Sequence, residues 1–384
     1  MLPFHDASLR LLHERRRNML KLRISRYRAQ SAQAKASDLP PPSQSVWYHI
    51  YRCAQLFCRT PRSLVCLTNP SHSNRDDHMF LAFVGVPYRV FASLLKRFRP
   101  MYKPEPINAS RPGRPLIILP HQALAVLLMF YCSRSDNKYL GLIHNLTTRR
   151  IDDIVARSEP LMFAVLRNFP DAVIEWPSFK EQRASASRIE SKYPLVPRRF
   201  GFVDGKNLSV LQSGNVEKQN SQYNGWLHDC FVSGVLVFDA NGCLIWCKHN
   251  CPGSWNDSDM CRELCTRLMD PTKTLPNHGL CADTAFPVGT ALFRHIVSPL
   301  KEGELESMSP DVQPAAAAVS SQITSLRQAC EWGMGSIQKP FKRLLVPLPW
   351  RDSVRTVRLA NIFRLWNVRV RNTGISQINE SFGS

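Results

Sequence analysis

The sequence of 384 residues has no run of 18 apolar side chains and is short of acidic residues. Its most apolar stretch, Leu116–Cys132, is interrupted at Pro120–Gln122, so a membrane-spanning helix is not expected. The first residues place charge where a signal peptide has an apolar segment, and no small-residue cleavage site follows. These absences predict an intracellular protein and disfavour secreted and membrane-spanning classes.

CxxC pairs, which form common zinc sites, are also absent. Five of the twelve cysteines recur at four-residue spacing in two groups, namely Cys243, Cys247, Cys251, Cys261 and Cys265. Inside a cell these side chains are expected to remain thiols. The favoured interpretation is small buried apolar residues, with a structural zinc site as the alternative.

The shortage of acidic residues leaves a formal charge of +20, from 50 Lys and Arg against 30 Asp and Glu. The excess lies at the ends, with +8 in residues 1–60, +5 in 61–112 and +6 in 341–384. Such a charge attracts polyanions, which makes nucleic acid the leading partner. We expect the basic ends to contact phosphate, while the nearly neutral middle could hold clustered carboxylates.

Composition divides the chain into three parts. A basic tail and Pro-rich linker are expected over 1–45, a helical subdomain over 46–195 and a catalytic domain over 196–378. Within the tail, Ser8–Arg28 interleaves eight basic residues with apolar ones, which suits either a nuclear-localisation or DNA-contact helix or a solvated tail. The linker is Ser37–Gln44, where consecutive prolines end any helix.

Helical periodicity dominates the second part. Apolar residues at three- and four-residue steps predict two helices over 76–102, broken near Pro87, and a buried helix over Gln122–Cys132. A short helix over Lys138–His144 precedes another capped by Thr147, which resembles a helix-turn-helix. Its second helix begins with Arg149 and Arg150, where such motifs meet DNA. The alternative is a helix pair that only packs against its neighbours.

The third part reads as an α/β domain. A short strand running into a turn is expected over 199–207, and two strands joined by an Asn-Gly turn over 230–250. Further strands are expected over 279–282 and 293–297, with helices over 257–269 and 322–338, whereas residues 298–321 read as an exposed loop. This order predicts a mixed sheet flanked by helices and preceded by the helical subdomain.

Three acidic residues stand out by position. Asp204 and Asp283 each end a predicted strand, and Glu331 lies beside the apolar seam of the last predicted helix. Carboxylates gathered at one sheet edge repel each other unless cations neutralise them, and Mg²⁺ or Mn²⁺ prefers such oxygen ligands. Two such ions could activate a water and stabilise the leaving oxygen of a phosphodiester. Taken singly, each has an ordinary alternative: a turn residue, a helix cap, or a surface pair with Arg327.

Short motifs in a fixed order carry a family resemblance. They are FVDG (202–205), PGSWNDS (252–258), ADTAFP (282–287), EWGMGSIQKPFKRL (331–344) and LWNVRVRNTGISQI (365–378). With Asp283 79 positions after Asp204 and Glu331 48 positions after Asp283, residues 195–378 resemble the DDE endonuclease domain of PIF/Harbinger-type transposases and their domesticated nuclease relatives. The helical stretch 76–195 resembles the region that precedes this domain.

The resemblance implies an RNase H-like fold in which Asp204, Asp283 and Glu331 form the catalytic triad and bind two divalent ions, Mg²⁺ or Mn²⁺. The family commonly has His where this chain has Asn256, an amide that cannot titrate near neutral pH. Asp257 is assigned a supporting role, with helix capping as the alternative. Lys206 either contacts phosphate or is merely exposed.

The leading expectation is a metal-dependent DNA endonuclease or transposase that cleaves phosphodiester bonds of double-stranded DNA in the nucleus. The resemblance also implies a separate Myb-like DNA-binding partner. A second class is a domesticated DNA- or partner-binding protein that keeps the fold without catalysis. RNase H-type cleavage of RNA ranks below both.

Overall fold

The structure is a computed structural model that describes residues 80–103, 106–107, 116–144, 146–225, 227–286, 292 and 294–382. All of these residues lie in the compact unit Thr60–Ser384. The predicted basic segment Ser8–Arg28 and linker Ser37–Gln44 lie outside the described residues. None of the described helices is both long and apolar enough to cross a membrane.

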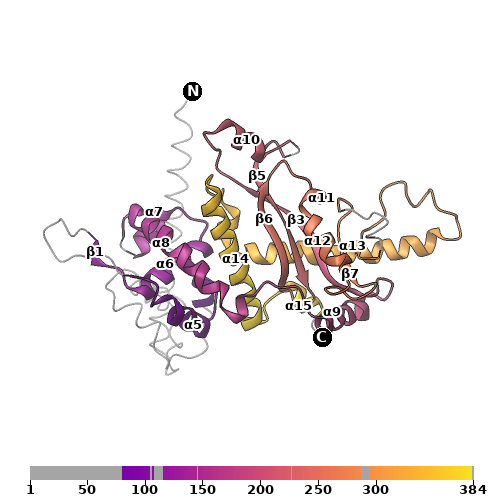
Figure 1. Cartoon of the computed structure of the whole chain (residues 1–384), viewed down its shortest axis with the longest axis horizontal. Coiled ribbons are helices and arrows are strands. Elements are labelled where there is room, and N and C mark those ends of the chain that lie inside the picture. Colours follow the sequence, from indigo (N-terminus) through magenta and orange to yellow (C-terminus); the bar gives the residue numbers. More distant parts are fainter. Residues whose placement is uncertain are drawn as a thin grey trace, which may run out of the picture. The chain divides into compact units, whose positions relative to one another are not determined.

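The first described part is helical (Figure 1). Residues 80–84 are helical and are followed by α5 (Tyr88–Phe98), α6 (Pro120–Cys132), α7 (Asn137–His144) and α8 (Thr148–Arg167). Two short strands, β1 (Pro106–Ile107) and β2 (Leu116–Ile117), pair between α5 and α6. The predicted break near Pro87 and the buried helix before Cys132 are confirmed, because α6 buries nine consecutive residues from Ala123.

A short 3-10 helix, η1 (Pro170–Ala172), leads into α9 (Phe179–Lys192), which packs against the central strand. The start of α9 is fixed by a capping box. Ser178 accepts a hydrogen bond from the Glu181 amide, and the Glu181 carboxylate accepts one from the Ser178 amide at 2.8 Å. Two otherwise unpaired amides are thereby satisfied, which sets where the helix begins.

The predicted mixed sheet is confirmed. Its strands are β3 (Arg199–Ser209), β4 (Tyr223–Asn224), β5 (Asp229–Asp239), β6 (Leu244–Pro252), β7 (Gly279–Cys281) and β8 (Ile296–Val297). Strand β5 pairs antiparallel with β3, β4 and β6, whereas β7 runs parallel to β3 and to β8. The predicted hairpin is β5–β6, turned at Gly242, whose φ of +82° suits glycine.

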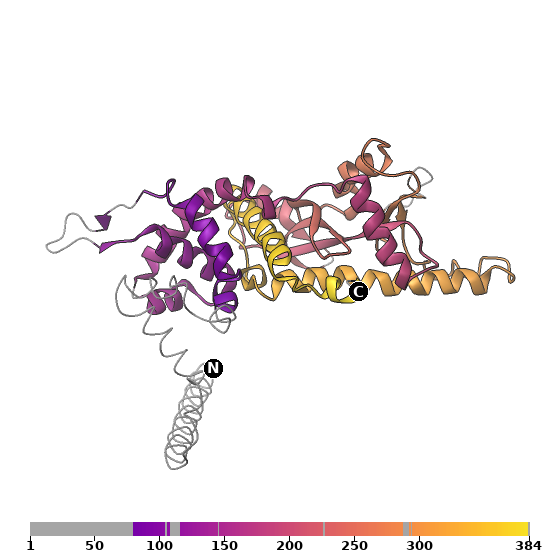
Figure 2. The ribbon, with the colours of Figure 1, turned by 90° about the horizontal axis from the view of Figure 1, so that it is seen from below.

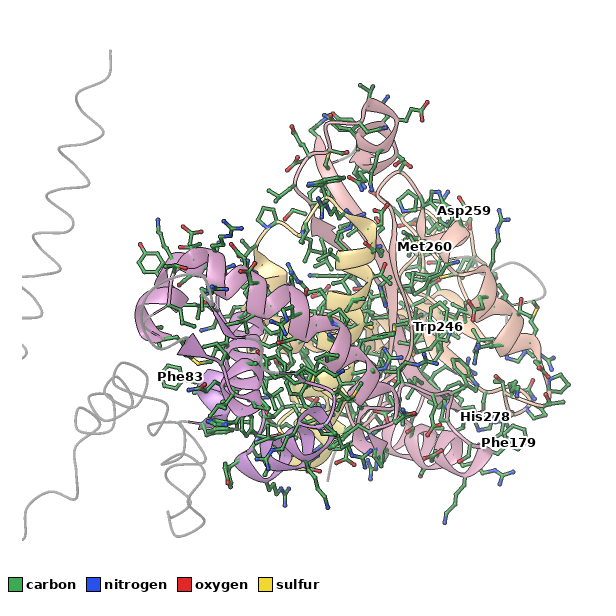
Figure 3. The ribbon with its side chains drawn as sticks, turned by 60° about the vertical axis from the view of Figure 1, so that its left-hand side comes forward. Phe83, Phe179, Trp246, Asp259, Met260 and His278 are labelled. Atoms are coloured by element: carbon green, nitrogen blue, oxygen red, sulfur yellow. The ribbon has the colours of Figure 1, made fainter. Side chains whose placement is uncertain are left out.

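Alternation along β3 divides its side chains between two layers. Phe202 stacks on Phe382 of α15 (Gln377–Phe382), with ring centroids 5.3 Å apart, so the even-numbered residues from Phe202 onward face that layer. Val203 belongs instead to a core with side chains of α9, α11 (Asp257–Met260) and α12 (Arg262–Met269). Trp246 of β6 and Met260 of α11, labelled in Figure 3, lie in the same core.

Helix α13 (Gln313–Gln338) packs along β3 and β7 (Figure 2). A short 3-10 helix, η2 (Lys342–Leu345), and α14 (Asp352–Thr373) follow it. Helix α14 packs against both β6 and α8. Its Asn367 accepts a hydrogen bond from the Leu244 amide at 2.8 Å and donates to the Val173 carbonyl at 2.9 Å, which joins the sheet to the segment after η1.

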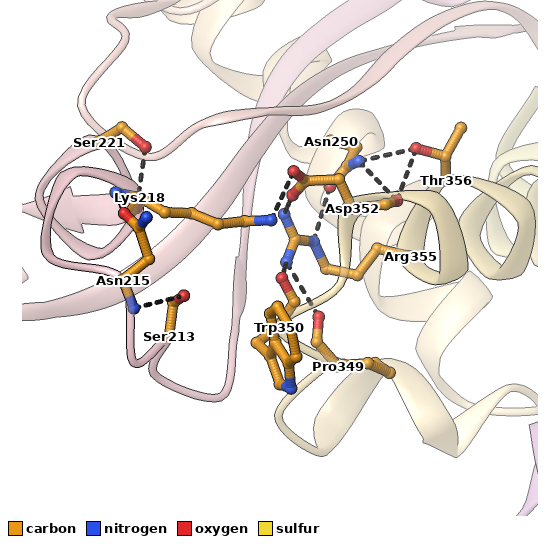
Figure 4. Close-up of polar contacts among 10 residues, drawn as sticks. All are labelled: Ser213, Asn215, Lys218, Ser221, Asn250, Pro349, Trp350, Asp352, Arg355 and Thr356. Atoms are coloured by element: carbon orange, nitrogen blue, oxygen red, sulfur yellow. Dashed lines mark hydrogen bonds and ion pairs between the residues drawn. The ribbon is translucent and has the colours of Figure 1, made fainter.

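A polar network ties α10 (Val216–Gln222) to the start of α14 (Figure 4). Lys218 Nζ lies 2.7 Å from the Asp352 carboxylate, which also pairs with Arg355. Arg355 is 1 % exposed and donates to Asn250 of β6 and to the carbonyl of Trp350. This buried arginine therefore fixes the chain turn that precedes α14.

Two predictions about element boundaries are wrong. Asp204 does not end a strand, because β3 continues through Gly205 and Lys206, which pair with Val235 and Gly234 of the long strand β5. The predicted loop 298–321 is helical from 313 onward, where α13 begins (Figure 2). A Pro in the first turn and four consecutive alanines, the strongest helix formers, explain the longer helix.

Candidate active site

The parallel pairing of β3 and β7 brings Asp204 and Asp283 together. Phe202 pairs with Cys281, and the two aspartates lie two residues further along their respective strands. Asp283 influences the pKa of Asp204 electrostatically, as expected for neighbouring carboxylates. Asp283 also accepts a hydrogen bond from the Thr284 amide at 2.7 Å, which fixes the carboxylate just after the strand.

Glu331 reaches the same edge from α13 and is connected to it by Arg327. Arg327 Nη1 lies 3.4 Å from Asp283 Oδ2, and its Nη2 lies 3.2 Å from Glu331 Oε1. The predicted surface pair of Arg327 with Glu331 is confirmed, but the same guanidinium also binds a strand-end carboxylate. One cation therefore bridges two of the three predicted triad residues.

Asp257 approaches from the opposite face of β3. Its carboxylate lies against Gly205, where a Cβ would stand only 2.6 Å from Asp257 Oδ1. The predicted capping alternative for Asp257 is not what the helix uses, because Asn256 is the N-cap of α11 and accepts a hydrogen bond from the Asp259 amide at 2.9 Å. The Asp257 carboxylate is thus left to face the strand that bears Asp204.

Burial raises the pKa of Asp204 to about 6, and the charges of Asp283 and Asp257 act in the same direction. The Gly205 amide, which donates to Asp204 Oδ1 at 2.8 Å, and the Arg327 charge oppose this shift. Burial, with help from Asp283, likewise raises the pKa of Asp257. The site therefore favours a neutralising cation beyond those it already contains.

Lys206 lies two residues after Asp204 and on the same face of β3. Its side chain is half-buried, and Nζ contacts Gln338 Oε1 of α13 at 3.4 Å. Burial lowers the pKa of Lys206, whereas the charge of Asp204 raises it. Lys206 is therefore not the merely exposed lysine of one sequence interpretation, and it is a second positive charge beside the carboxylates.

The donor chemistry of this edge fits a divalent cation of the hard, oxygen-preferring kind. Asp204, Asp283 and Glu331 offer only carboxylate oxygens, the ligands that Mg²⁺ and Mn²⁺ prefer. In the described part of the chain, no three His, Cys, Asp or Glu side chains converge closely enough to hold one ion. At this edge Arg327 stands between two of the carboxylates, so metal binding would require the guanidinium to move.

Arg149 and Arg150 lie apart from the carboxylates. Both belong to the first turn of α8, on the other side of α14 from β7 (Figures 1 and 2). Arg149 is exposed, and Arg150 lies 3.6 Å from Asp153. Helices α7 and α8 are the predicted helix pair, but Thr147 makes no side-chain hydrogen bond at the N-cap position.

Several basic residues of 341–384 form contacts inside the fold, which leaves fewer of them to contact phosphate. Arg358 donates to Glu159 of α8 at 2.7 and 3.1 Å, and both side chains are buried. Arg355 and Arg369 donate to backbone carbonyls. Charge counting could not distinguish these internal donors from surface cations. Lys342, Arg351 and Arg371 are exposed.

The five cysteines of the two spaced groups are free thiols. Four of them are buried, and Cys247 is half-buried. Burial raises the pKa of Cys243 to about 12 and that of Cys247 to about 11, so these thiols stay protonated. The interpretation as small apolar core residues is confirmed for these positions.

Sequence comparison agrees with the motifs. Residues 203–364 match the family model of the DDE superfamily endonuclease, a segment that runs from β3 into α14 and includes Asp204, Asp257, Asp283 and Glu331. The match supports the superfamily, and the mixed sheet flanked by helices is consistent with its RNase H-like fold. No curated protein and no solved structure matches the chain.

Proposed function

We propose that the protein is a divalent-metal-dependent DNA endonuclease or transposase of the PIF/Harbinger type, acting in the nucleus. The observation that carries the proposal is that Asp204 and Asp283 lie on adjacent parallel strands and that Arg327 links Asp283 to Glu331, all inside the segment that matches the endonuclease family. These three residues would hold Mg²⁺ or Mn²⁺. When bound, such an ion would activate the attacking water and stabilise the leaving oxygen of the phosphodiester.

The protein's own residues prepare this edge for that chemistry. The Gly205 amide orients the Asp204 carboxylate, and Thr284 orients that of Asp283. Asp257 lies against Gly205 and contributes negative charge without belonging to the triad. Lys206 is close enough to Asp204 to balance part of its charge and to meet a phosphate oxygen at the sheet edge.

Double-stranded DNA is the proposed substrate. Arg149 at the exposed start of α8 and the basic residues outside the sheet domain would supply phosphate contacts, which position a duplex without reading its sequence. A separate Myb-like DNA-binding protein is the proposed source of target choice. This division of labour follows from the resemblance rather than from a contact in the structure.

Nicking of supercoiled plasmid by the full chain tests the proposal. Wild type should nick with Mg²⁺ or Mn²⁺ and not in a chelator, and Asp204→Ala should lose this activity. Asp259→Ala is the matched control, because Asp259 pairs with Arg262 on the outer surface of α11 and α12. Equal nicking by wild type and Asp204→Ala would contradict the proposal. No nicking with either ion would favour a DNA- or partner-binding protein without catalysis.

A further inference from the structure

Arg327 is the one residue that contacts two of the proposed metal ligands within the described residues. Its two terminal nitrogens bind different carboxylates, Asp283 at 3.4 Å and Glu331 at 3.2 Å. The planar guanidinium is suited to such two-sided binding because its donors point in fixed, separate directions. An ion shared by the same two carboxylates would need the oxygens that Arg327 now occupies.

The surroundings of Arg327 explain why a cation is held there. Asp204 and Asp257 add two more carboxylates to this site, with Asp257 lying against Gly205, and the charge of Asp204 also acts on Lys206. Without Arg327, Asp283 and Glu331 would face this negative charge without the cation that now contacts both of them. The arginine therefore offsets part of the repulsion among these carboxylates in the absence of a metal.

Arg327 is also able to leave. Its side chain is 31 % exposed, and those of Asp283 and Glu331 are 36 % and 54 % exposed, so both ion pairs are accessible to solvent. Ion pairs at such exposed positions contribute little free energy and exchange easily. A buried arginine such as Arg355, fixed by several carbonyls, has no comparable freedom.

We infer that Arg327 is an internal counterion that competes with the divalent metal for Asp283 and Glu331 and so sets the metal concentration at which the site fills. This inference rests on the proposed function and concerns regulation of the same site. Arg327 is thus a positioning residue, whose displacement accompanies metal loading. Its removal should strengthen metal binding but lower the thermal stability of the metal-free protein.

The test is calorimetric titration of Mn²⁺ into the metal-free full chain, with no DNA present. Arg327→Gln should bind Mn²⁺ about three- to tenfold more tightly than wild type, as expected for losing two exposed ion pairs. Arg327→Lys should fall between them, because an ammonium keeps the charge but cannot bridge both carboxylates. Arg267→Gln, which breaks the similar pair with Glu263 on α12, should match wild type.

Thermal unfolding supplies a second readout. Metal-free Arg327→Gln should have a lower melting temperature than metal-free wild type. Added Mn²⁺ should raise the melting temperature of Arg327→Gln by more than that of wild type. Suppose that wild type binds Mn²⁺ and Asp204→Asn does not. Unchanged or weaker Mn²⁺ binding by both Arg327 variants would then overturn the counterion role and leave the proposed function standing. If neither wild type nor Arg327→Gln binds Mn²⁺, the proposed function is contradicted together with it. Binding by Arg327→Gln and not by wild type would be the strongest support.

Discussion

The Asp257 carboxylate lies directly on Gly205, the residue that follows Asp204 in the middle of β3. A Cβ at this position would stand 2.6 Å from Asp257 Oδ1, closer than side-chain atoms pack in proteins. The glycine therefore lets a carboxylate approach the strand, and any larger residue here would displace Asp257. The Asp-Gly sequence, which suggests a turn, lies instead within a strand that has Asp204 on one face and Asp257 packed against the other.

Gly205→Ala should displace Asp257 and disturb the neighbouring Asp204. We expect nicking activity to fall about ten- to a hundredfold, the usual effect of losing a group that supports a metal ligand. Gly335→Ala is the control, because a Cβ on Gly335 of α13 meets no atom within 4 Å and should leave activity unchanged. Wild-type activity in Gly205→Ala would show that Asp257 has no supporting role.

The raised pKa of Asp204 predicts a pH-dependent loss of stability in the metal-free protein. Because the folded state holds this proton up to about pH 6 and the unfolded state releases it near pH 4, folding is favoured at low pH and loses stability as pH rises across that window. Urea unfolding in a chelator should show the decline for wild type and a smaller one for Asp204→Asn. An equal decline in the two proteins would contradict the assigned pKa.

The buried pair of Glu159 and Arg358 joins α8 to α14. Glu159→Gln leaves a buried guanidinium without its anionic partner, so the free energy of unfolding should fall by about 3 to 5 kcal/mol. Glu263→Gln, which breaks the exposed pair with Arg267, should cost under about 1 kcal/mol. Similar losses measured by urea unfolding for the two variants would show that the buried pair contributes no more to stability than the exposed pair.

Local patterns were sufficient for much of the sheet. The apolar runs on either side of Asp239–Gly242 predict β5 and β6, because β-branched and aromatic residues and an Asn-Gly dipeptide have strong local preferences. The proximity of Asp204 and Asp283 was also accessible, since each was predicted at the end of a strand, but in the structure it results from the register of β3 with β7 and not from the end of β3. Family motifs then identified Glu331 as the third carboxylate.

Other features depend on contacts between distant segments. The continuation of β3 past Asp204 results from its long pairing with β5, which overrides the turn preference of Asp-Gly. The roles of Arg355 and Arg358 depend on the carbonyls and the carboxylate they meet in the fold. Arg327 was visible as a partner of Glu331 at helical spacing, but its second contact with Asp283 comes from the packing of α13 on β7.

The central claim is that the carboxylates beside Arg327 support metal-dependent cleavage of phosphodiester bonds. One comparison of two variants tests it most directly. Glu331→Gln and Glu263→Gln each neutralise a glutamate that pairs with an arginine four residues earlier or later on a helix. The measurement is the Mn²⁺-dependent rate of plasmid nicking. We predict that Glu331→Gln slows it about a hundredfold or more while Glu263→Gln leaves it unchanged. Equal rates for the two variants would contradict the account.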